Sequence, residues 1–398
     1  MLLKNCRYII TQDPQRRILE HCDLEIEGNV ITRIAPSIAK EGIDCSEKIV
    51  MPGLVNTHTH SGMHLLKGVC DDEQLKTWLD IVIPKEKALT DAEITAGCEM
   101  ACKEMILGGT TTFADLYWPI APIASAAKKF NMRCLLFPAL QNLAQGGATL
   151  DDVERLLQEK DERVAYGVGA HSIYACDEAT LQKASALAKR YGAMKLMHIA
   201  ETRKERFDIQ ERTGKLPVEY LESIAWLDDK TLLVHAIWLT KAEIRLLKKF
   251  GVSISHCPVS NMKLASGGVM PLPEMHSEGV TVGLGTDSVA SNNNLGLFEE
   301  MKVCGLLHKH HRWDARTAPL QNIVDMATID GARALGMDKD IGSLEVGKKA
   351  DIITLDLSSS RISPINNLLS AVVYAAQSAD VCDVIIDGKT IVRDRTWV

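Results

Sequence analysis

Short apolar runs and longer amphipathic segments alternate along most of this chain. The apolar runs have the length of buried strands, and the segments between them carry apolar positions at helical spacing, as over 91–107 and 178–191. The strands are expected at about 49–58, 110–115, 133–140, 164–170, 194–198, 231–235, 253–256 and 281–285. Strand and helix units that alternate in this number predict a (β/α)8 barrel, an α/β fold.

The two ends of the chain carry a different pattern. Residues 22–34 and 381–393 each alternate between apolar and polar positions on either side of a Gly-Asn or Asp-Gly turn, which is typical of a β-hairpin. Together with 350–356 they predict a small β-sandwich formed from both chain ends. The expected division is 1–50 for the N-terminal part of the sandwich, 51–344 for the barrel and 345–398 for the C-terminal part of the sandwich.

Side chains that can bind a metal follow several of the apolar runs. His58 and His60 end the first run one residue apart, and alternation along a strand turns both imidazoles to the same side. His198, His235 and Asp287 follow later runs. The carboxyl ends of barrel strands form one face, where catalytic side chains from different strands converge. The pattern therefore predicts a metal site on that face, although an isolated H-x-H pair would be weak evidence.

Length, charge and cysteine usage narrow the class of protein. The 398 residues suffice for one barrel of about 250 residues and a small second unit. The net charge of -7, without long runs of one sign, argues against nucleic acid as a partner. The sequence shows neither a secretory signal nor a stretch suited to cross a bilayer, so no membrane partner is expected. Eleven dispersed cysteines predict reduced thiols and a cytoplasmic location.

A series of motifs in this order resembles the amidohydrolase superfamily, over nearly the whole chain. The segments are PGLVNTHTH at 52–60, GGTTTFAD at 108–115, GAHSIYAC at 169–176, HIAET at 198–202, VHA at 234–236, SHCPVSNMKLASG at 255–267, GLGTDSVASNNNL at 283–295 and GKKADIITLD at 347–356. Within the superfamily the chain is most similar to deaminases of adenosine, 5'-deoxyadenosine, methylthioadenosine and S-adenosylhomocysteine, which border on triazine hydrolases and guanine deaminases. The resemblance implies the same barrel and sandwich, and a hydrolytic deaminase of adenine nucleosides.

The resemblance also implies one divalent metal ion per chain. Its expected ligands are three imidazoles and one carboxylate, a set that suits Zn2+ first and Fe2+ second: His58, His60, His198 and Asp287. Superfamily members with two metals use a carboxylated lysine on the fourth strand, and 163–172 contains no lysine. The chain also lacks a C-x-x-C pair, which excludes the zinc deaminase design that uses two cysteines and a histidine.

Three side chains are expected to move protons. A divalent ion lowers the pKa of a bound water from 15.7 toward about 7, and Asp287 would take the released proton. Glu201, three residues after His198, would carry protons to N1 of the purine. His235 would hydrogen-bond the attacking hydroxide and stabilise the tetrahedral intermediate. In the metal subtype that the chain resembles this histidine is not a ligand, but the sequence leaves ligation by His235 open.

Four further residues match substrate-binding positions of the family. Trp78 and Glu86 match a segment that covers the purine and hydrogen-bonds the ribose hydroxyls in relatives that accept nucleosides, although Glu86 alone would also suit a solvated helix start. His171 matches a pocket residue, and the alternative is a histidine that hydrogen-bonds within its loop. Ser291 matches a position near the base, and the alternative is a helix cap.

Other functions of the same fold provide the alternatives. One is a hydrolase of another heterocycle, such as a chlorotriazine or guanine, and another is a scaffold without metal. The ligand set and Glu201 argue against the scaffold, whereas Trp78 and Glu86 favour a substrate with a ribose. The resemblance further implies a homo-oligomer. Relatives that accept S-adenosylhomocysteine carry arginines where 138–150 has neither Arg nor Lys, so neutral 5' groups are expected to be preferred.

Several remaining residues have simpler expected roles. Cys98 and Cys102 lie four apart on an apolar helix and are expected to pack in the core. The polar stretch around His308, His310 and His311 reads as a solvated helix end. The sequence assigns no role to His64 or His256.

Overall fold

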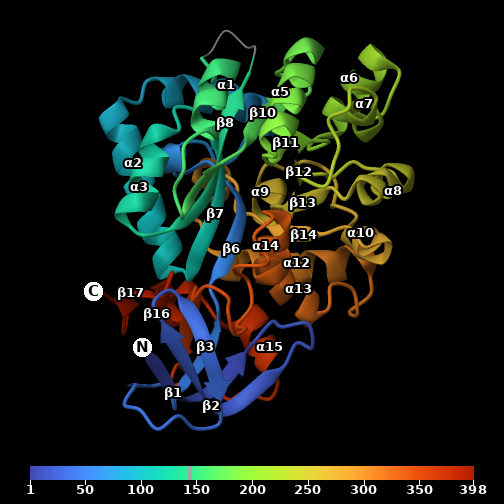
Figure 1. Ribbon diagram of the computed structural model, residues 1–398. Coiled ribbons are helices and arrows are strands. Elements are labelled where there is room, and N and C mark those ends of the chain that lie inside the picture. The colour runs from blue at the N-terminus through green and yellow to red at the C-terminus, as the bar shows by residue number, and fades with distance from the viewer. Residues whose placement is uncertain (142–145) are drawn as a thin grey trace.

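Two sheets organise the computed structural model, which describes residues 1–141 and 146–398 (Figure 1). One is a parallel sheet with the order β14-β13-β12-β11-β10-β8-β7-β6, in which β9 also pairs with β8. The other is a mixed sheet built from both chain ends, and both termini lie there, below the barrel in the view of Figure 1.

The parallel sheet forms the predicted barrel, and each expected strand is present. Its strands are β6 (Leu54–Thr59), β7 (Thr110–Tyr117), β8 (Arg133–Leu140), β9 (Val164–Tyr166), β10 (Val168–Ser172), β11 (Lys195–Ile199), β12 (Thr231–His235), β13 (Ser253–His256) and β14 (Val282–Leu284). A parallel bridge between Thr59 and Asp287 links the end of β6 to the residues after β14, so the barrel is nearly closed. Buried apolar side chains such as Phe137, Leu232 and Val234 pack together from the barrel strands.

Helices surround the barrel. They are α1 (Leu75–Lys87), α2 (Asp91–Leu107), α3 (Ala121–Lys129), α4 (Leu150–Leu157), α5 (Glu178–Tyr191), α6 (Arg203–Thr213), α7 (Pro217–Ser223), α8 (Lys241–Phe250), α9 (Pro258–Lys263), α10 (Leu272–Glu278), α11 (Val289–Asn292), α12 (Leu297–Arg312), α13 (Leu320–Ala327) and α14 (Ile329–Ala334), with a 3-10 helix η1 (Ser61–Leu66). The helices α2 and α5 have the predicted bounds, because clear caps mark their ends. A capping box of Thr90 and Glu93 begins α2, and Gly192 ends α5 in the left-handed conformation with φ 61°.

The mixed sheet has the order β18-β17-β16-β15-β5-β1-β2-β3, with β4 paired to β1. Its strands are β1 (Leu2–Ile10), β2 (Ile18–Glu27), β3 (Val30–Ala35), β4 (Ile43–Asp44), β5 (Lys48–Pro52), β15 (Ile352–Asp356), β16 (Val381–Ile386), β17 (Lys389–Arg393) and β18 (Thr396–Trp397). Both predicted hairpins, β2–β3 and β16–β17, are confirmed. Three short helical segments lie between β15 and β16: α15 (Leu368–Ser370), a π-helical turn η2 (Ala371–Ala375) and a 3-10 helix η3 (Ser378–Asp380).

The chain passes from one sheet to the other inside what the sequence predicts as a single strand at 49–58. The segment divides into β5 of the mixed sheet and β6 of the barrel. Gly53 lies between them, and a Cβ atom at this position would come within 2.2 Å of the Thr111 hydroxyl. The close approach of this connecting residue to β7 therefore requires a glycine here.

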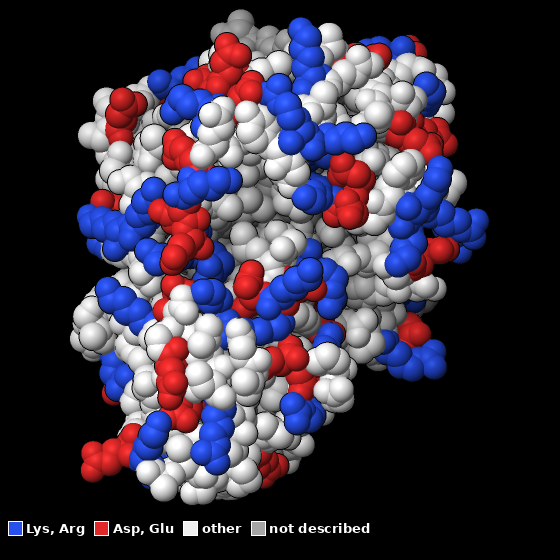
Figure 2. Space-filling view, viewed as in Figure 1, with Lys and Arg blue, Asp and Glu red and all other residues white. Residues whose placement is uncertain are grey.

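The described surface and core agree with the sequence patterns. Acidic and basic side chains are interspersed over the face shown in Figure 2. All eleven cysteines are free thiols, and Cys98 and Cys102 are buried in the core, as predicted. Among the described residues, no helix combines the length and apolar character that a bilayer span would need.

Candidate metal and substrate site

A cavity of about 400 Å³ opens among the residues that end and follow the barrel strands. It brings together nine of the ten residues that the sequence singled out: His60, Trp78, Glu86, His171, His198, Glu201, His235, Asp287 and Ser291. The tenth, His58, is fully buried directly against His60 and His198. Side chains from β6, β11 and β12 therefore converge as the barrel topology requires.

Four of these side chains place their metal-binding atoms together. The Nε2 atom of His58 lies 3.1 Å from Nε2 of His60 and 3.2 Å from Nε2 of His198. Oδ1 of Asp287 lies 3.2 Å from Nε2 of His60 and 3.4 Å from Nε2 of His58. Ligand atoms held about 2.0–2.1 Å from a tetrahedral zinc ion are separated by about 3.3 Å, so this spacing fits one divalent ion.

The outer nitrogens of two imidazoles fix which atoms face inward. Nδ1 of His60 donates to the carbonyl oxygen of Leu116 at 2.7 Å, and Nδ1 of His198 donates to that of His171 at 2.8 Å. In the neutral form, each ring then presents the lone pair of Nε2 to the cluster. Lone pairs at such short separations repel one another unless a cation lies between them. The donor set therefore fits a divalent metal.

Burial and charge act together on the ionisation of this cluster. Burial lowers the pKa of His58 to about 3 and takes the pKa of His198 well below its ordinary value. Burial also acts to lower the pKa of His60, but the Asp287 carboxylate outweighs it and raises that pKa to about 9. The pKa of Asp287 is held well below its usual range, because the imidazoles of His58 and His60 outweigh burial.

The backbone after the strands adopts an unusual conformation around the cavity. Asp287 has φ 61°, His235 has φ 70° and Ala200 has φ 47°, all in the left-handed region that residues with a side chain rarely adopt. His235 and Asp287 line the cavity directly, and Ala200 precedes the lining residue Glu201. Such conformations cost about 1–3 kcal/mol each, and surrounding contacts must stabilise them.

The second carboxylate oxygen of Asp287 is held by hydroxyl groups. Ser260 Oγ lies 2.6 Å and Ser291 Oγ 3.2 Å from Oδ2, and the two hydroxyls are 2.7 Å apart. Ser291 lies within α11, whose N-cap is Ser288, so the alternative of a helix cap at Ser291 is wrong. Ser291 also borders the cavity, and its position near the base stays a prediction of the family resemblance.

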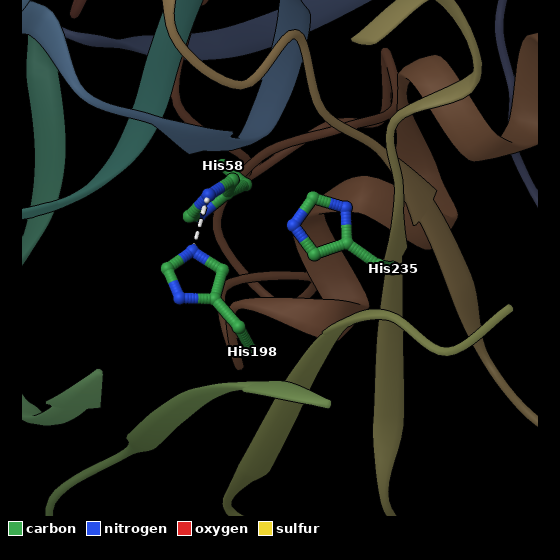
Figure 3. Close-up of side chains that lie close together, drawn as sticks. All are labelled: His58, His198 and His235. Atoms are coloured by element: carbon green, nitrogen blue, oxygen red, sulfur yellow. Dashed lines mark hydrogen bonds between the residues drawn. The ribbon is translucent and has the colours of Figure 1, made fainter. Parts of the chain in front are cut away.

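Glu201 and His235 face each other beside the metal-binding atoms. Oε2 of Glu201 lies 3.7 Å from Nε2 of His235. Burial raises the pKa of Glu201, and His235 offsets part of this effect. Figure 3 shows the rings of His58, His198 and His235 turned toward one another, with the contact between His58 and His198 dashed. One ligand-type atom from each of these rings lies within 4.8 Å of the others.

The remaining cavity residues include the predicted nucleoside contacts. Trp78 Nε1 donates to the carbonyl oxygen of Ala290 at 3.3 Å, which fixes the indole in the cavity wall. Glu86 lines the cavity, so it is not merely a solvated charge; burial raises its pKa, and a hydrogen bond with Tyr117 offsets part of the effect. Nδ1 of His171 lies 3.2 Å from Ser172 Oγ, so this ring both lines the cavity and contacts its own strand.

Sequence reasoning missed some residues around the site. Ser260 and Asn261 belong to the quoted SHCPVSN segment but received no role, and Glu205 follows the HIAET segment by three residues. His64 is not among the described cavity-lining residues; it is buried and its Nε2 lies 3.5 Å from Glu104. The expectation of a solvated His308 is wrong, because this ring is buried and contacts Nε2 of His256 at 3.0 Å.

Comparison with known proteins places these observations in a family. The model of the amidohydrolase family matches residues 49–391. A 5'-deoxyadenosine deaminase of Methanosarcina barkeri is 39% identical over 99% of this chain and 93% of its own length. A 5-methylthioadenosine/S-adenosylhomocysteine deaminase of Thermococcus onnurineus is 40% identical over 94% of this chain and 90% of its own length. The crystal structure of an adenosine deaminase from Xanthomonas campestris with bound zinc superposes with a TM-score of 0.96, at 32% identity, over 100% of this chain and 94% of that chain.

Proposed function

The chain belongs to the amidohydrolase family, and we propose that within this family it is a metal-dependent deaminase of adenine nucleosides. The reaction would replace the 6-amino group by a hydroxyl group and release ammonia. The observation that carries this proposal is the position of the Glu201 carboxyl group, which lies in one cavity with the convergent imidazoles and Asp287. Relatives named as deaminases of 5'-deoxyadenosine and of methylthioadenosine and S-adenosylhomocysteine, similar over nearly the full chain, support it.

The metal would be one zinc ion per chain, with four protein ligands: His58, His60, His198 and Asp287. When bound, a divalent ion supplies an activated water, because it lowers the pKa of that water toward about 7. Neutral imidazoles and a carboxylate suit zinc or ferrous iron better than magnesium or calcium, which prefer oxygen ligands. The zinc in the adenosine deaminase of similar structure supports the choice of zinc.

Two side chains would transfer protons, and a third would hydrogen-bond the attacking water. Asp287, which remains ionised because its pKa is low, takes a proton from the attacking water. Glu201 holds a proton more readily than an exposed glutamate does, because burial raises its pKa, and it donates that proton to N1 as the water oxygen bonds to C6. His235 faces the same space and hydrogen-bonds the attacking water through Nε2.

The second half of the reaction breaks the bond between C6 and the amino nitrogen. The proton that Asp287 accepted reaches the amino group, which leaves as ammonia with the bonding electrons. The proton of the new C6 hydroxyl group then returns to Glu201 and N1 retains its proton, so the product forms as the 6-oxo tautomer of the 6-hydroxy compound. One water is consumed and one ammonia is formed for each nucleoside. The net protonation of the enzyme is therefore unchanged after a turnover.

The nucleoside would be held on the side of the cavity formed by α1 and its neighbours. We assign Trp78 to the purine face and Glu86 to the ribose hydroxyls, since a carboxylate can accept hydrogen bonds from two vicinal hydroxyls. His171 and Ser291 border the base in this arrangement. Glu86 therefore favours a substrate that carries a ribose over a free purine or a triazine.

The proposal extends to the state of the protein in the cell. The eleven free cysteines suit a cytoplasmic location, because a reducing compartment maintains thiols. We propose a homo-oligomer by the likeness of the chain to its family, and light scattering of the purified protein would test this. A small nucleoside is the proposed partner of the cavity.

A release assay tests the function directly. The zinc-loaded protein is incubated with adenosine, 5'-deoxyadenosine, methylthioadenosine, S-adenosylhomocysteine, guanine and a chlorotriazine, and ammonia and chloride are measured. We expect ammonia from the adenine nucleosides, with conversion of each nucleoside to its 6-hydroxy product. Ammonia from guanine alone, or chloride from the triazine alone, would instead identify a hydrolase of another heterocycle.

A further inference from the structure

A buried hydrogen bond joins His235 at the end of β12 to Asn261 on the short helix α9. Nδ1 of His235 lies 2.9 Å from Oδ1 of Asn261, and the two residues are 2% and 6% exposed. The preceding residue, Ser260, contacts Asp287 in the same way. Two consecutive residues of α9 therefore each hold one side chain of the proposed site.

This contact determines where the imidazole carries its hydrogen. A neutral imidazole has one N–H group, and the partner of one nitrogen decides which nitrogen bears it. An asparagine amide can face the ring with its oxygen, which requires hydrogen on Nδ1, or with its nitrogen, which requires hydrogen on Nε2. The two arrangements differ at the other edge of the ring, which faces the cavity.

The surroundings of Nε2 favour the first arrangement. Nε2 of His235 lies 3.7 Å from the Glu201 carboxyl group, which burial favours in its protonated form, and one nitrogen of its ring lies within 4.8 Å of nitrogens of His58 and His198. A lone pair on Nε2 is attracted by a cation held by those imidazoles, whereas an N–H group directed at the same space is repelled by it. The oxygen of Asn261 therefore faces Nδ1.

We propose that Asn261 is a positioning residue that fixes His235 in the tautomer with hydrogen on Nδ1, so that Nε2 offers a lone pair to the attacking water. The proposal rests on the proposed function for its chemical meaning. In this tautomer His235 accepts a hydrogen bond from the water and draws its proton away from the oxygen that attacks. The opposite tautomer would donate to that oxygen and reduce its nucleophilicity.

The helix α9 is itself held firmly enough to act as a support. The main-chain N–H of Val259 donates to the buried Glu300 carboxylate of α12 at 3.2 Å. Nε2 of His256, just before α9, lies 3.0 Å from Nε2 of His308 on α12. Both contacts join the start of α9 to α12, so the backbone that carries the Asn261 amide is held in a fixed position relative to α12.

Two variants of Asn261 separate the roles of its oxygen and its volume. Asn261→Asp retains an acceptor for Nδ1–H, whereas Asn261→Leu has a similar volume and no acceptor. The tautomer of His235 is observed in the zinc-loaded protein by 15N NMR of labelled histidines, and its signals are identified by their absence from His235→Gln. Metal content, kcat and KM are measured on the same samples.

We expect the Nδ1–H tautomer in the unchanged protein and in Asn261→Asp, and its loss in Asn261→Leu. Loss of the residue that hydrogen-bonds the outer nitrogen of an active-site histidine typically lowers activity by about 10–100-fold, so kcat of Asn261→Leu should fall by about this factor. KM should change little, and Asn261→Asp should recover most of the lost kcat. Ser260→Ala is the matched control, because it alters the neighbouring residue of α9 but should leave the His235 signals unchanged.

The opposite NMR result would overturn the proposal. An Nε2–H tautomer in the unchanged protein would do so, as would an Nε2–H tautomer in Asn261→Asp. Should Asn261→Leu fail to fold, the unchanged protein and Asn261→Asp still provide both results. The NMR measurement of the tautomer needs no substrate, so it tests the role of Asn261 even if the protein releases no ammonia from any nucleoside. A failure to release ammonia would count against the proposed function and not against the role of Asn261.

Discussion

The carboxylate of Glu205 accepts a hydrogen bond from the main-chain N–H of Glu201 at 2.9 Å. It also accepts one from Ala200 at 3.0 Å, where the backbone has φ 47°. The two bonds stabilise a turn that alanine rarely adopts, and the turn brings the Glu201 side chain into the cavity. Burial raises the pKa of Glu205 to about 8, because it disfavours the ionised carboxylate. The buried carboxyl group of Glu205 thus supports the position of a second buried carboxyl group, that of Glu201.

Replacement of Glu201 should remove proton transfer and spare metal binding. Glu201→Gln retains the shape of the side chain but cannot exchange a proton with N1. We expect turnover to fall by about 10²–10⁴-fold, the usual effect of losing a general acid or base. Steady-state kinetics and elemental analysis of the same preparation measure the two effects. Loss of metal in this variant would show that Glu201 ligates the ion or supports a ligand.

His58 is central to metal binding, because its Nε2 atom contacts both neighbouring imidazoles of the cluster. His58→Ala should therefore lose the metal and activity together. Elemental analysis of the unchanged protein should give one divalent metal per chain. Two equivalents of metal, or an active variant without metal, would contradict the proposed mononuclear site.

Zinc affinity should depend on pH through His60. In the absence of metal the Asp287 carboxylate raises the pKa of His60 to about 9, so at neutral pH this ring carries a proton that zinc must displace. The apparent affinity should rise about tenfold per pH unit as the pH increases toward 9, and level off above it. Competition with a chelator of known pH dependence measures this slope, and a flat profile below pH 9 would show that His60 binds without releasing a proton.

The strands could be predicted because their apolar runs are buried on both faces, and the helices α2 and α5 because their caps are encoded locally. Local polarity predicts a solvated His308, because its neighbours His310 and His311 are polar and exposed. Its place on α12 follows from helical spacing instead: Met301, Cys304 and His308 share one buried face. The helical spacing therefore predicts the burial of His308 better than the polarity of its neighbours does.

Other parts of the site have no local signal. Hydrogen bonds from Ser260 to Asp287 and from His235 to Asn261 join residues 27 and 26 positions apart, and depend on how the strands are arranged in space. The motif order placed the ligands on one face, but the partners that orient them emerge only from packing. The division of 49–58 between two sheets likewise has no local signal, because β5 pairs with β1 and β15 whereas β6 pairs with β7.

Glu86 should contribute to ribose binding. Glu86→Gln retains hydrogen-bonding capacity but loses the charge that strengthens a bond from a hydroxyl. We expect kcat/KM for adenosine to fall about tenfold, which corresponds to about 1.4 kcal/mol, chiefly through KM. The matched measurement uses 2',3'-dideoxyadenosine, which lacks both hydroxyls. An equal fall with that substrate would assign Glu86 a role away from the ribose.

The charge of the 5' group should decide substrate preference. The described cavity lining includes Lys87 but no arginine, and the guanidinium of Arg203 is exposed over the rings of Phe207 and Trp238 at 5.4 Å and 5.9 Å. Residues 142–145 of the segment 138–150 lie outside the described residues, but their sequence has no Arg or Lys. A carboxylate without a bidentate partner is costly to desolvate, so neutral 5' groups should be favoured.

We therefore expect adenosine, 5'-deoxyadenosine and methylthioadenosine to exceed S-adenosylhomocysteine in kcat/KM by about tenfold, or about 1.4 kcal/mol of transition-state binding. Side-by-side kinetics measure the ratio, with Lys87→Met and Arg203→Met as paired variants. If S-adenosylhomocysteine is used as efficiently as the neutral nucleosides, the prediction is wrong. A selective loss of that activity in one variant would then identify the cation, because methionine preserves most of the side-chain length and removes the charge and its N–H donors. An unchanged ratio in both variants would place the carboxylate in solvent, where it needs no partner.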